Sequence, residues 1–148
     1  MRLAKDLLAI PMLLALLGAL APITASAGGP PGPVEINGQK VLTLVNREPP
    51  GVRCNNNIQV AAELSNIYKI PVVVIPQGLA GPGAKAPAVY YGNDLIAEDG
   101  GAHNGMVSYT MVGDVLEIED AKKHQQKGRL FEVKQEHDSL KTAIKTVK

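Results

Sequence analysis

The residue best suited to chemistry is Cys54, the one cysteine of a 148-residue chain. It follows a Pro-Pro-Gly loop and precedes a stretch with helical spacing of apolar residues, so we expect it at or just before a helix N-terminus. The partial positive charge of that terminus and the adjacent Arg53 both favour a thiolate. These residue types indicate a monothiol that reacts with an external thiol or a protein partner.

A lone cysteine leaves several states open. It cannot form a disulfide within the chain, so it is an inert buried thiol, a reactive thiol, the link of a disulfide-bonded dimer, or a metal ligand. The metal hypothesis has two pairs of ligands, His103 with Cys54 and Asp120 with His124 at i, i+4. Neither pair reaches the ligand number of a zinc site, so we predict no metal site and no cofactor, with a metal carrier as the third hypothesis.

Residues 1–27 have the parts of a secretory signal peptide. Arg2 and Lys5 are basic, Leu7–Leu20 is strongly apolar, and Ala25-Ser26-Ala27 is a small-residue cleavage site. The alternative is a membrane anchor, but the apolar stretch is short for a span and is broken by prolines. We therefore expect cleavage after Ala27, a periplasmic or secreted protein, and no membrane contact afterwards.

The charge balance excludes one class of partner. The predicted signal peptide holds two of the 15 basic and one of the 14 acidic residues, so the rest of the chain is formally neutral. It has no Trp and only one Phe. Electrostatic capture and aromatic stacking are the usual means of binding nucleic acid, so we expect no nucleic-acid partner.

The elements around Cys54 are predicted to form a strand–helix–strand unit. After a lead-in over residues 28–40, which ends in an Asn-Gly turn, residues 41–45 form an apolar strand. Apolar residues recur at helical spacing over residues 55–68, with an N-cap at one of three asparagines. Residues 72–75 form a second apolar strand, and both strands are expected to be buried on both faces, as in a parallel sheet.

A hairpin and a helix are predicted next. Beyond a loop over residues 77–86, residues 88–91 and 95–98 are two strands joined by a Gly-Asn-Asp turn. From Met106 to Ile118 the apolar residues follow a helical stripe, with Asn104 as its cap. A strand over residues 106–112 is the competing prediction.

The C-terminal residues 121–148 form a polar extension. A short alternating strand is predicted over residues 129–134. Leu140, Ile144 and Val147 then fit a last amphipathic helix with a basic end. Both charge signs are interleaved in the extension, which is typical of a solvated helix.

In this order, the elements over residues 41–118 resemble the thioredoxin-like superfamily in its compact glutaredoxin-type form. Cys54-Asn55-Asn56-Asn57 stands where that family has its C-x-x-C or C-x-x-S motif. Ala86-Pro87 precedes a strand where the family keeps a cis-proline facing its active-site cysteine. The stretch Tyr91–Leu95, followed by Gly100-Gly101, is similar to the family's closing hairpin and helix.

The resemblance implies an α/β, thioredoxin-like domain over residues 41–120, with a central mixed four-stranded sheet flanked by helices and a C-terminal helical extension. It implies Cys54 and Pro87 as catalytic residues of a monothiol thiol-disulfide oxidoreductase, and the position of Arg53 beside the cysteine, where it favours the thiolate, adds Arg53 to them. Because Asn57 occupies the resolving position, the resolving thiol would be external. The alternative is a non-catalytic binding or accessory module on the same fold, which holds a partner at the sheet edge or at the loop over residues 77–86.

Overall fold

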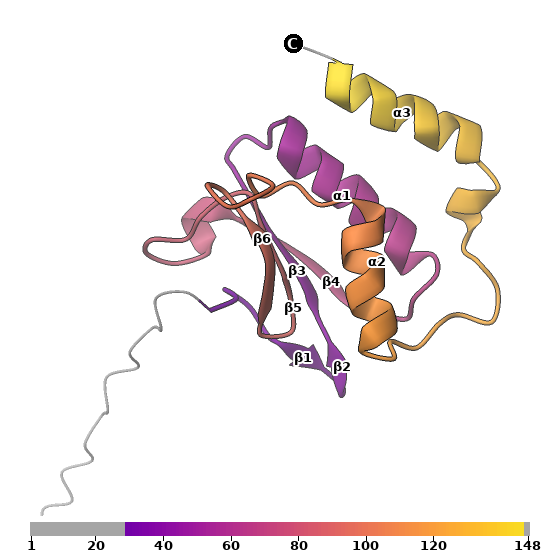
Figure 1. The fold of residues 1–148 in the computed structure, drawn as a ribbon, viewed down its shortest axis with the longest axis horizontal. Coiled ribbons are helices and arrows are strands. Elements are labelled where there is room, and N and C mark those ends of the chain that lie inside the picture. Colours follow the sequence, from indigo (N-terminus) through magenta and orange to yellow (C-terminus); the bar gives the residue numbers. More distant parts are fainter. Residues whose placement is uncertain (1–28, 147–148) are drawn as a thin grey trace, which may run out of the picture.

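The computed structural model describes residues 29–146, which form an α/β fold with a central sheet and three α-helices (Figure 1). The signal peptide predicted over residues 1–27 lies outside the described residues, as does Val147 of the predicted last helix. Within residues 29–146, no helix has the length and apolar character needed to cross a membrane.

The central sheet has the strand order β4-β3-β5-β6. β3 (Leu42–Asn46) and β4 (Val72–Pro76) run parallel and are connected by the helix α1 (Val52–Ser65). β5 (Ala88–Tyr91) is antiparallel to β3, and β6 (Asp94–Glu98) is antiparallel to β5. The predicted strand–helix–strand unit, the hairpin and the α/β class with a mixed four-stranded sheet are therefore confirmed.

One face of the sheet carries the main core. Leu42 and Leu44 of β3 pack with Leu64 of α1 and with Leu116 of α2 (Tyr109–Ile118). Figure 1 shows the two helices beside each other. Alternate strand residues point to opposite faces, so the other face holds a smaller buried cluster. Its members are Val45, Ala86, Ala88 and Tyr90.

β4 is an edge strand, and the prediction that residues 72–75 are buried on both faces is wrong. β3 is buried at every residue because it has a neighbour on each side, whereas β4 pairs only with β3. Val74 is 44% exposed. The sequence is equally apolar in both strands, and an apolar run does not distinguish a central strand from an edge. After β4, the predicted loop over residues 77–86 contains the short 3-10 helix η1 (Gln77–Leu79).

Both predicted helix starts need correction. α1 begins at Val52, earlier than predicted, with Gly51 as its N-cap. The Asn55 carboxamide lies inside the first turn and donates to the carbonyl oxygen of Gly51 at 3.0 Å, so it is not the cap. α2 begins at Tyr109, later than predicted, because the hydroxyl of Ser108 accepts from the amide of Met111 and caps the helix.

The region before α2 is a turn-rich loop. Asn104, the predicted cap, has a φ of 50° and lies in this loop, and its side chain accepts from the amide of Gly100 at 3.1 Å. The competing prediction of a strand over residues 106–112 is also wrong, since Tyr109 onward is helical. At the N-terminal side, β1 (Glu35–Ile36) and β2 (Gln39–Lys40) form a small hairpin around the predicted Asn-Gly turn.

The chain after α2 runs back along the end of α1 as a strap over residues 122–128. The amide of His124 donates to Ile67 O at 2.8 Å, and the amide of Gly128 donates to Asn66 O at 2.7 Å. These bonds use carbonyl groups just beyond the last turn of α1. The strap leads into η2 (Arg129–Phe131), a 3-10 helix where the sequence predicted a strand.

The last helix, α3 (Lys134–Thr146), is present as predicted and packs on α1. Its contact with α1 is mainly polar. His137 is buried with Nε2 3.4 Å from Glu63 Oε1, and Lys141 Nζ lies 2.7 Å from Glu63 Oε2. Leu140, expected on the packed face, is 49% exposed, so the apolar stripe of this helix is only partly used.

Candidate functional site

Cys54 lies in the first turn of α1, with its side chain turned toward the end of β3. It is a free cysteine and only 1% exposed. The backbone amide of Arg47, the residue that follows β3, donates to the sulfur at 3.3 Å. The thiol is therefore held inside the strand-to-helix connection rather than presented at a surface.

Arg53, next to the cysteine, points to another part of the molecule. Its Nη1 lies 2.5 Å from Asp99 Oδ1 and also donates to the carbonyl oxygen of Asn104. Arg47 donates from Nη2 to Asp99 Oδ2 at 2.9 Å and from Nε to Ala86 O at 2.8 Å. We call Arg47, Arg53 and Asp99 the arginine clamp. The hydrogen bond from Arg53, supported by Arg47, holds the pKa of the Asp99 carboxyl below its usual range.

Pro87 is packed beneath the loop that follows β6. Its side chain is fully buried, and the Ala86–Pro87 peptide bond is cis. The carbonyl oxygen of Pro87 accepts from the amide of Asp99 at 2.8 Å. Gly105 lies against the proline with a φ of 75°, and a Cβ there would collide with that same carbonyl oxygen. Little room remains beside the proline.

The structure therefore brings the three predicted residues to one end of the sheet. Arg47 connects the sulfur of Cys54 to Ala86, the residue before Pro87. Asp99 connects Arg53 to Pro87. Arg47 and Asp99 were missed by the sequence analysis. Their partners lie 39 and 46 positions away, and no local pattern points to such long-range contacts.

Two buried asparagines complete the site. Asn57, 1% exposed, donates from Nδ2 to Gly105 O at 2.7 Å and accepts from the amide of Val107 at 2.9 Å. Asn56 donates to Val107 O at 2.8 Å. These bonds fix the loop before α2 to the side of α1. A signal was present in the sequence, since three consecutive asparagines disfavour a helix interior unless their side chains are used elsewhere.

The two candidate ligand pairs of the metal hypothesis do not form a site. In the part of the chain that the structure describes, no group of three or more His, Cys, Asp or Glu side chains is placed to hold a metal ion. His103 is exposed while Cys54 is buried. Asp120, with a φ of 51°, lies in the turn that ends α2, and the His124 ring contacts Ser65 O at 3.1 Å.

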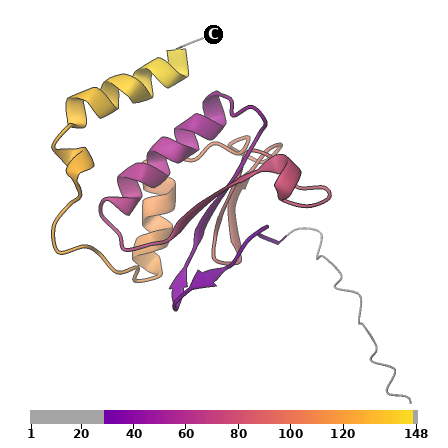
Figure 2. The ribbon, with the colours of Figure 1, turned by 180° about the vertical axis from the view of Figure 1, so that it is seen from behind.

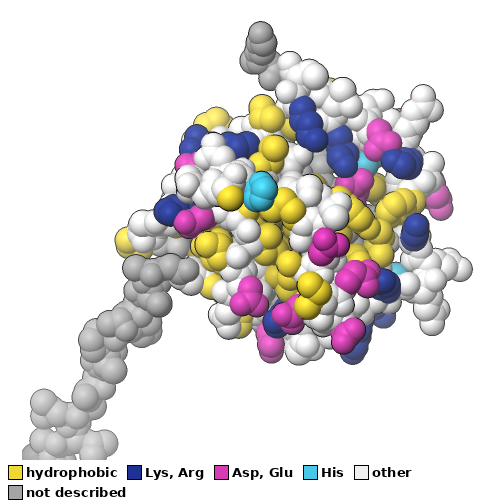
Figure 3. All heavy atoms as spheres, in the orientation of Figure 1, with side chains coloured by type: hydrophobic (Ala, Val, Ile, Leu, Met, Phe, Trp, Pro, Cys, Tyr) yellow, Lys and Arg dark blue, Asp and Glu magenta, His cyan; other side chains and the backbone are white. Residues whose placement is uncertain are grey.

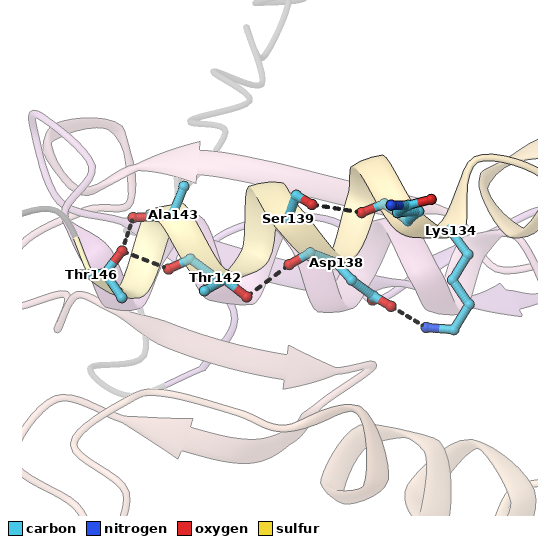
Figure 4. A pocket seen from close by; sticks show the side chains of 7 residues that line it. Lys134, Asp138, Ser139, Thr142, Ala143 and Thr146 are labelled. Carbon is cyan, nitrogen blue, oxygen red and sulfur yellow. Dashed lines mark hydrogen bonds and ion pairs between the residues drawn. The ribbon is translucent and has the colours of Figure 1, made fainter.

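A wide, open hollow runs along α3, and residues of this helix line it (Figure 4). The hydroxyls that line it bond to their own helix: Ser139 to Gln135 O, and Thr142 to Asp138 O. Lys134 pairs with the Asp138 carboxylate at 2.5 Å. Because these polar groups are already used, the hollow presents little to a ligand.

Two smaller hollows lie beside β4. One, of about 340 Å³, lies between α1 and the strand. The other, of about 360 Å³, lies at the ends of β3 and β4. On the face drawn in Figure 3, acidic and basic side chains are interspersed around apolar ones.

The chain was compared with protein-family models, with curated proteins and with solved structures. It has no match in any of the three.

Proposed function

We propose that this chain is an exported, non-catalytic binding module on a thioredoxin-like fold, in which Cys54 is a structural thiol. Support for the fold comes from the order of the elements. A strand, a helix and a parallel strand are followed by a proline, a hairpin and a helix, as the resemblance implies. The sheet order β4-β3-β5-β6 also agrees with the mixed sheet expected for such a domain.

The observation that carries the proposal is the burial of the sulfur. Thiol–disulfide exchange needs a thiolate that a disulfide can reach, so accessibility matters as much as acidity. Cys54 is 1% exposed, and its sulfur accepts a hydrogen bond from the backbone amide of Arg47. Arg47 and Arg53 both form ion pairs with Asp99. This arrangement favours a structural thiol and disfavours a reactive one.

The competing function is the monothiol oxidoreductase, with Cys54, Arg53 and Pro87 as its catalytic residues. Two observations favour it. Cys54 lies in the first turn of α1, where the helix dipole stabilises a thiolate, and a backbone amide already donates to its sulfur. For this function the loop over residues 47–51 must move aside to admit a substrate thiol.

The rate at which Cys54 reacts with a thiol probe distinguishes the two functions. For a structural thiol, we expect labelling of the native protein to be at least about a hundredfold slower than labelling in denaturant, because the thiol becomes accessible only by unfolding. Addition of oxidised glutathione should then give no mixed disulfide under native conditions. Fast native labelling, with a midpoint in pH well below about 8.5, would instead establish the reactive monothiol.

A metal carrier remains the third hypothesis, and the same preparation tests it. The purified protein would carry copper or zinc, and the Cys54→Ala variant would lose it. We expect neither, because a buried cysteine without two further ligands does not hold these ions.

A further inference from the structure

The two edge strands of the central sheet, β4 and β6, differ in how well they are protected from pairing with another chain. β6 carries Asp94 and Glu98, and its pairing with β5 has an irregular register at Val89 and Tyr90. Charges and bulges are the common means by which an edge strand avoids pairing with another chain. β4, with the sequence Val-Val-Val-Ile-Pro, has no charge. In Figure 2 it runs along the near side of the molecule.

The register identifies which backbone groups of β4 are free. Leu42 lies opposite Val72, and its amide donates to Pro71 O at 2.9 Å. In a parallel ladder, successive residues face alternate sides, so the peptide groups of Val73 face β3 and those of Val72 and Val74 face outward. No backbone bond within residues 29–146 uses these outward groups. Two N–H and two C=O groups are thus available.

The surface next to this edge is apolar. The hollow between α1 and β4 contains no charged side chain, and its lining residues are Leu44, Ile58, Ala61, Ala62, Ser65, Ile70, Val72 and Val74. It shares Ile58 and Val74 with the second hollow, which is lined by three prolines and, at the end away from the middle of β4, by polar and charged residues: Pro49, Pro50 and Pro76, with Asn46, Arg47 and Glu48. Small residues on the α1 side leave room for the side chains of a molecule that pairs with β4.

We propose that β4 is the interface between two copies of this chain, which pair antiparallel about a two-fold axis at Val73. In that register Val72 of each copy lies opposite Val74 of the other. These are the residues whose backbone groups face outward, and each pair exchanges two hydrogen bonds. The two Val73 residues then face each other as a non-hydrogen-bonded pair. The result is one continuous eight-stranded sheet.

The charge pattern favours a second copy over an unrelated partner. A two-fold interface brings the same patch of both copies together, and the residue at the axis, here Val73, faces its own equivalent, so a charge near the axis would repel itself. β4 has no charge, and its free groups already have the spacing that the two-fold register requires. This inference goes beyond the proposed function and does not depend on the reactivity of Cys54.

Disulfide trapping tests the register. We would introduce Val73→Cys into a Cys54→Ala background, so that the outcome is independent of the native thiol. Facing residues of a non-hydrogen-bonded pair have Cα atoms about 4.5 Å apart, which is within reach of a disulfide. We expect mild oxidation to convert most of this variant to a covalent dimer.

Ile75→Cys in the same background is the matched control. Its side chain leaves β4 on the same face as that of Val73, but the two-fold register places its equivalent about 13 Å away along the strand. It should stay monomeric on a denaturing gel. Equal trapping of both variants, or of neither, would overturn the proposed register.

Sedimentation of the protein from residue 28 onward gives a test without added cysteines. We expect a dimer at micromolar concentration and a more than about hundredfold weaker dimer for Val74→Lys, which places like charges across the axis. Leu95→Lys, on the other edge strand, should leave the dimer unchanged. Circular dichroism would establish that each variant is folded. A monomeric parent protein, or a dimer that survives Val74→Lys, would refute the interface.

Discussion

Replacing Asn57 by Leu is the most direct test of how the site is held together. The side chain is 1% exposed and joins α1 to the loop before α2 through two hydrogen bonds, at 2.7 Å to Gly105 O and 2.9 Å from the amide of Val107. Leucine has a similar volume, so the substitution removes the bonds without leaving a large cavity. It leaves one carbonyl and one amide group without a partner in a buried place.

The expected cost follows from these two groups. Each buried polar group left unsatisfied costs about 1–3 kcal/mol, so we expect the free energy of unfolding to fall by about 2–6 kcal/mol. That is a large share of the roughly 5–15 kcal/mol that stabilises a typical domain. Denaturant titration measures the change, and the exchange rate of the Val107 amide reports whether the loop has detached.

Asn55→Ala is the control for this substitution. Asn55 is a nearby, partly exposed asparagine, and its carboxamide donates to Pro50 O and Gly51 O at the surface. Its removal should cost no more than about 1 kcal/mol, because water replaces both bonds. If Asn57→Leu lowered stability no more than this control did, and Val107 exchanged no faster, the buried amides would not be what fixes the loop.

Two further outcomes follow from the same region. Gly105→Ala should destabilise the protein more than Gly81→Ala does. Both glycines have a positive φ, but only at Gly105 would a Cβ collide with Pro87. Denaturant titration of the two variants measures the difference. Asp99 should support folding only while it is ionised. Its pKa is lowered by the hydrogen bond from Arg53, so its contribution is complete above the unfolded value of about 3.9 and is lost as the pH falls through the lower folded value. The stability difference between the parent protein and Asp99→Asn should therefore shrink at low pH, and a difference that persisted unchanged at low pH would contradict this role.

The strands and the connections between them were predictable because apolar runs are local. Val41–Val45 and Val72–Ile75 indicated two strands on either side of a helical pattern, and the structure contains them. Their different burial was not predictable. It depends on which strand has two neighbours, and that depends on where the hairpin at Ala88–Glu98 joins the sheet.

The sequence predicted where the residues of the candidate site lie, but not which groups their side chains contact. The order of the elements brings Cys54, Arg53 and Pro87 to one end of the sheet, and the structure connects them there. The sequence indicated that Arg53 would favour a thiolate. Its guanidinium instead pairs with Asp99, which lies 46 positions along the chain, just beyond a predicted strand. Whether a charge acts on the nearest group or on a distant one is decided by the tertiary fold.

The strap over residues 122–128 has a consequence for shortened versions of this protein. Its amides occupy the carbonyl oxygens of Asn66 and Ile67, and the helix beyond it neutralises Glu63, whose side chain is 13% exposed. A version that stops near residue 120 would uncover both the end of α1 and a carboxylate on its flank. The polar C-terminal segment is thus a piece of the folded body, and expression boundaries are best placed after it.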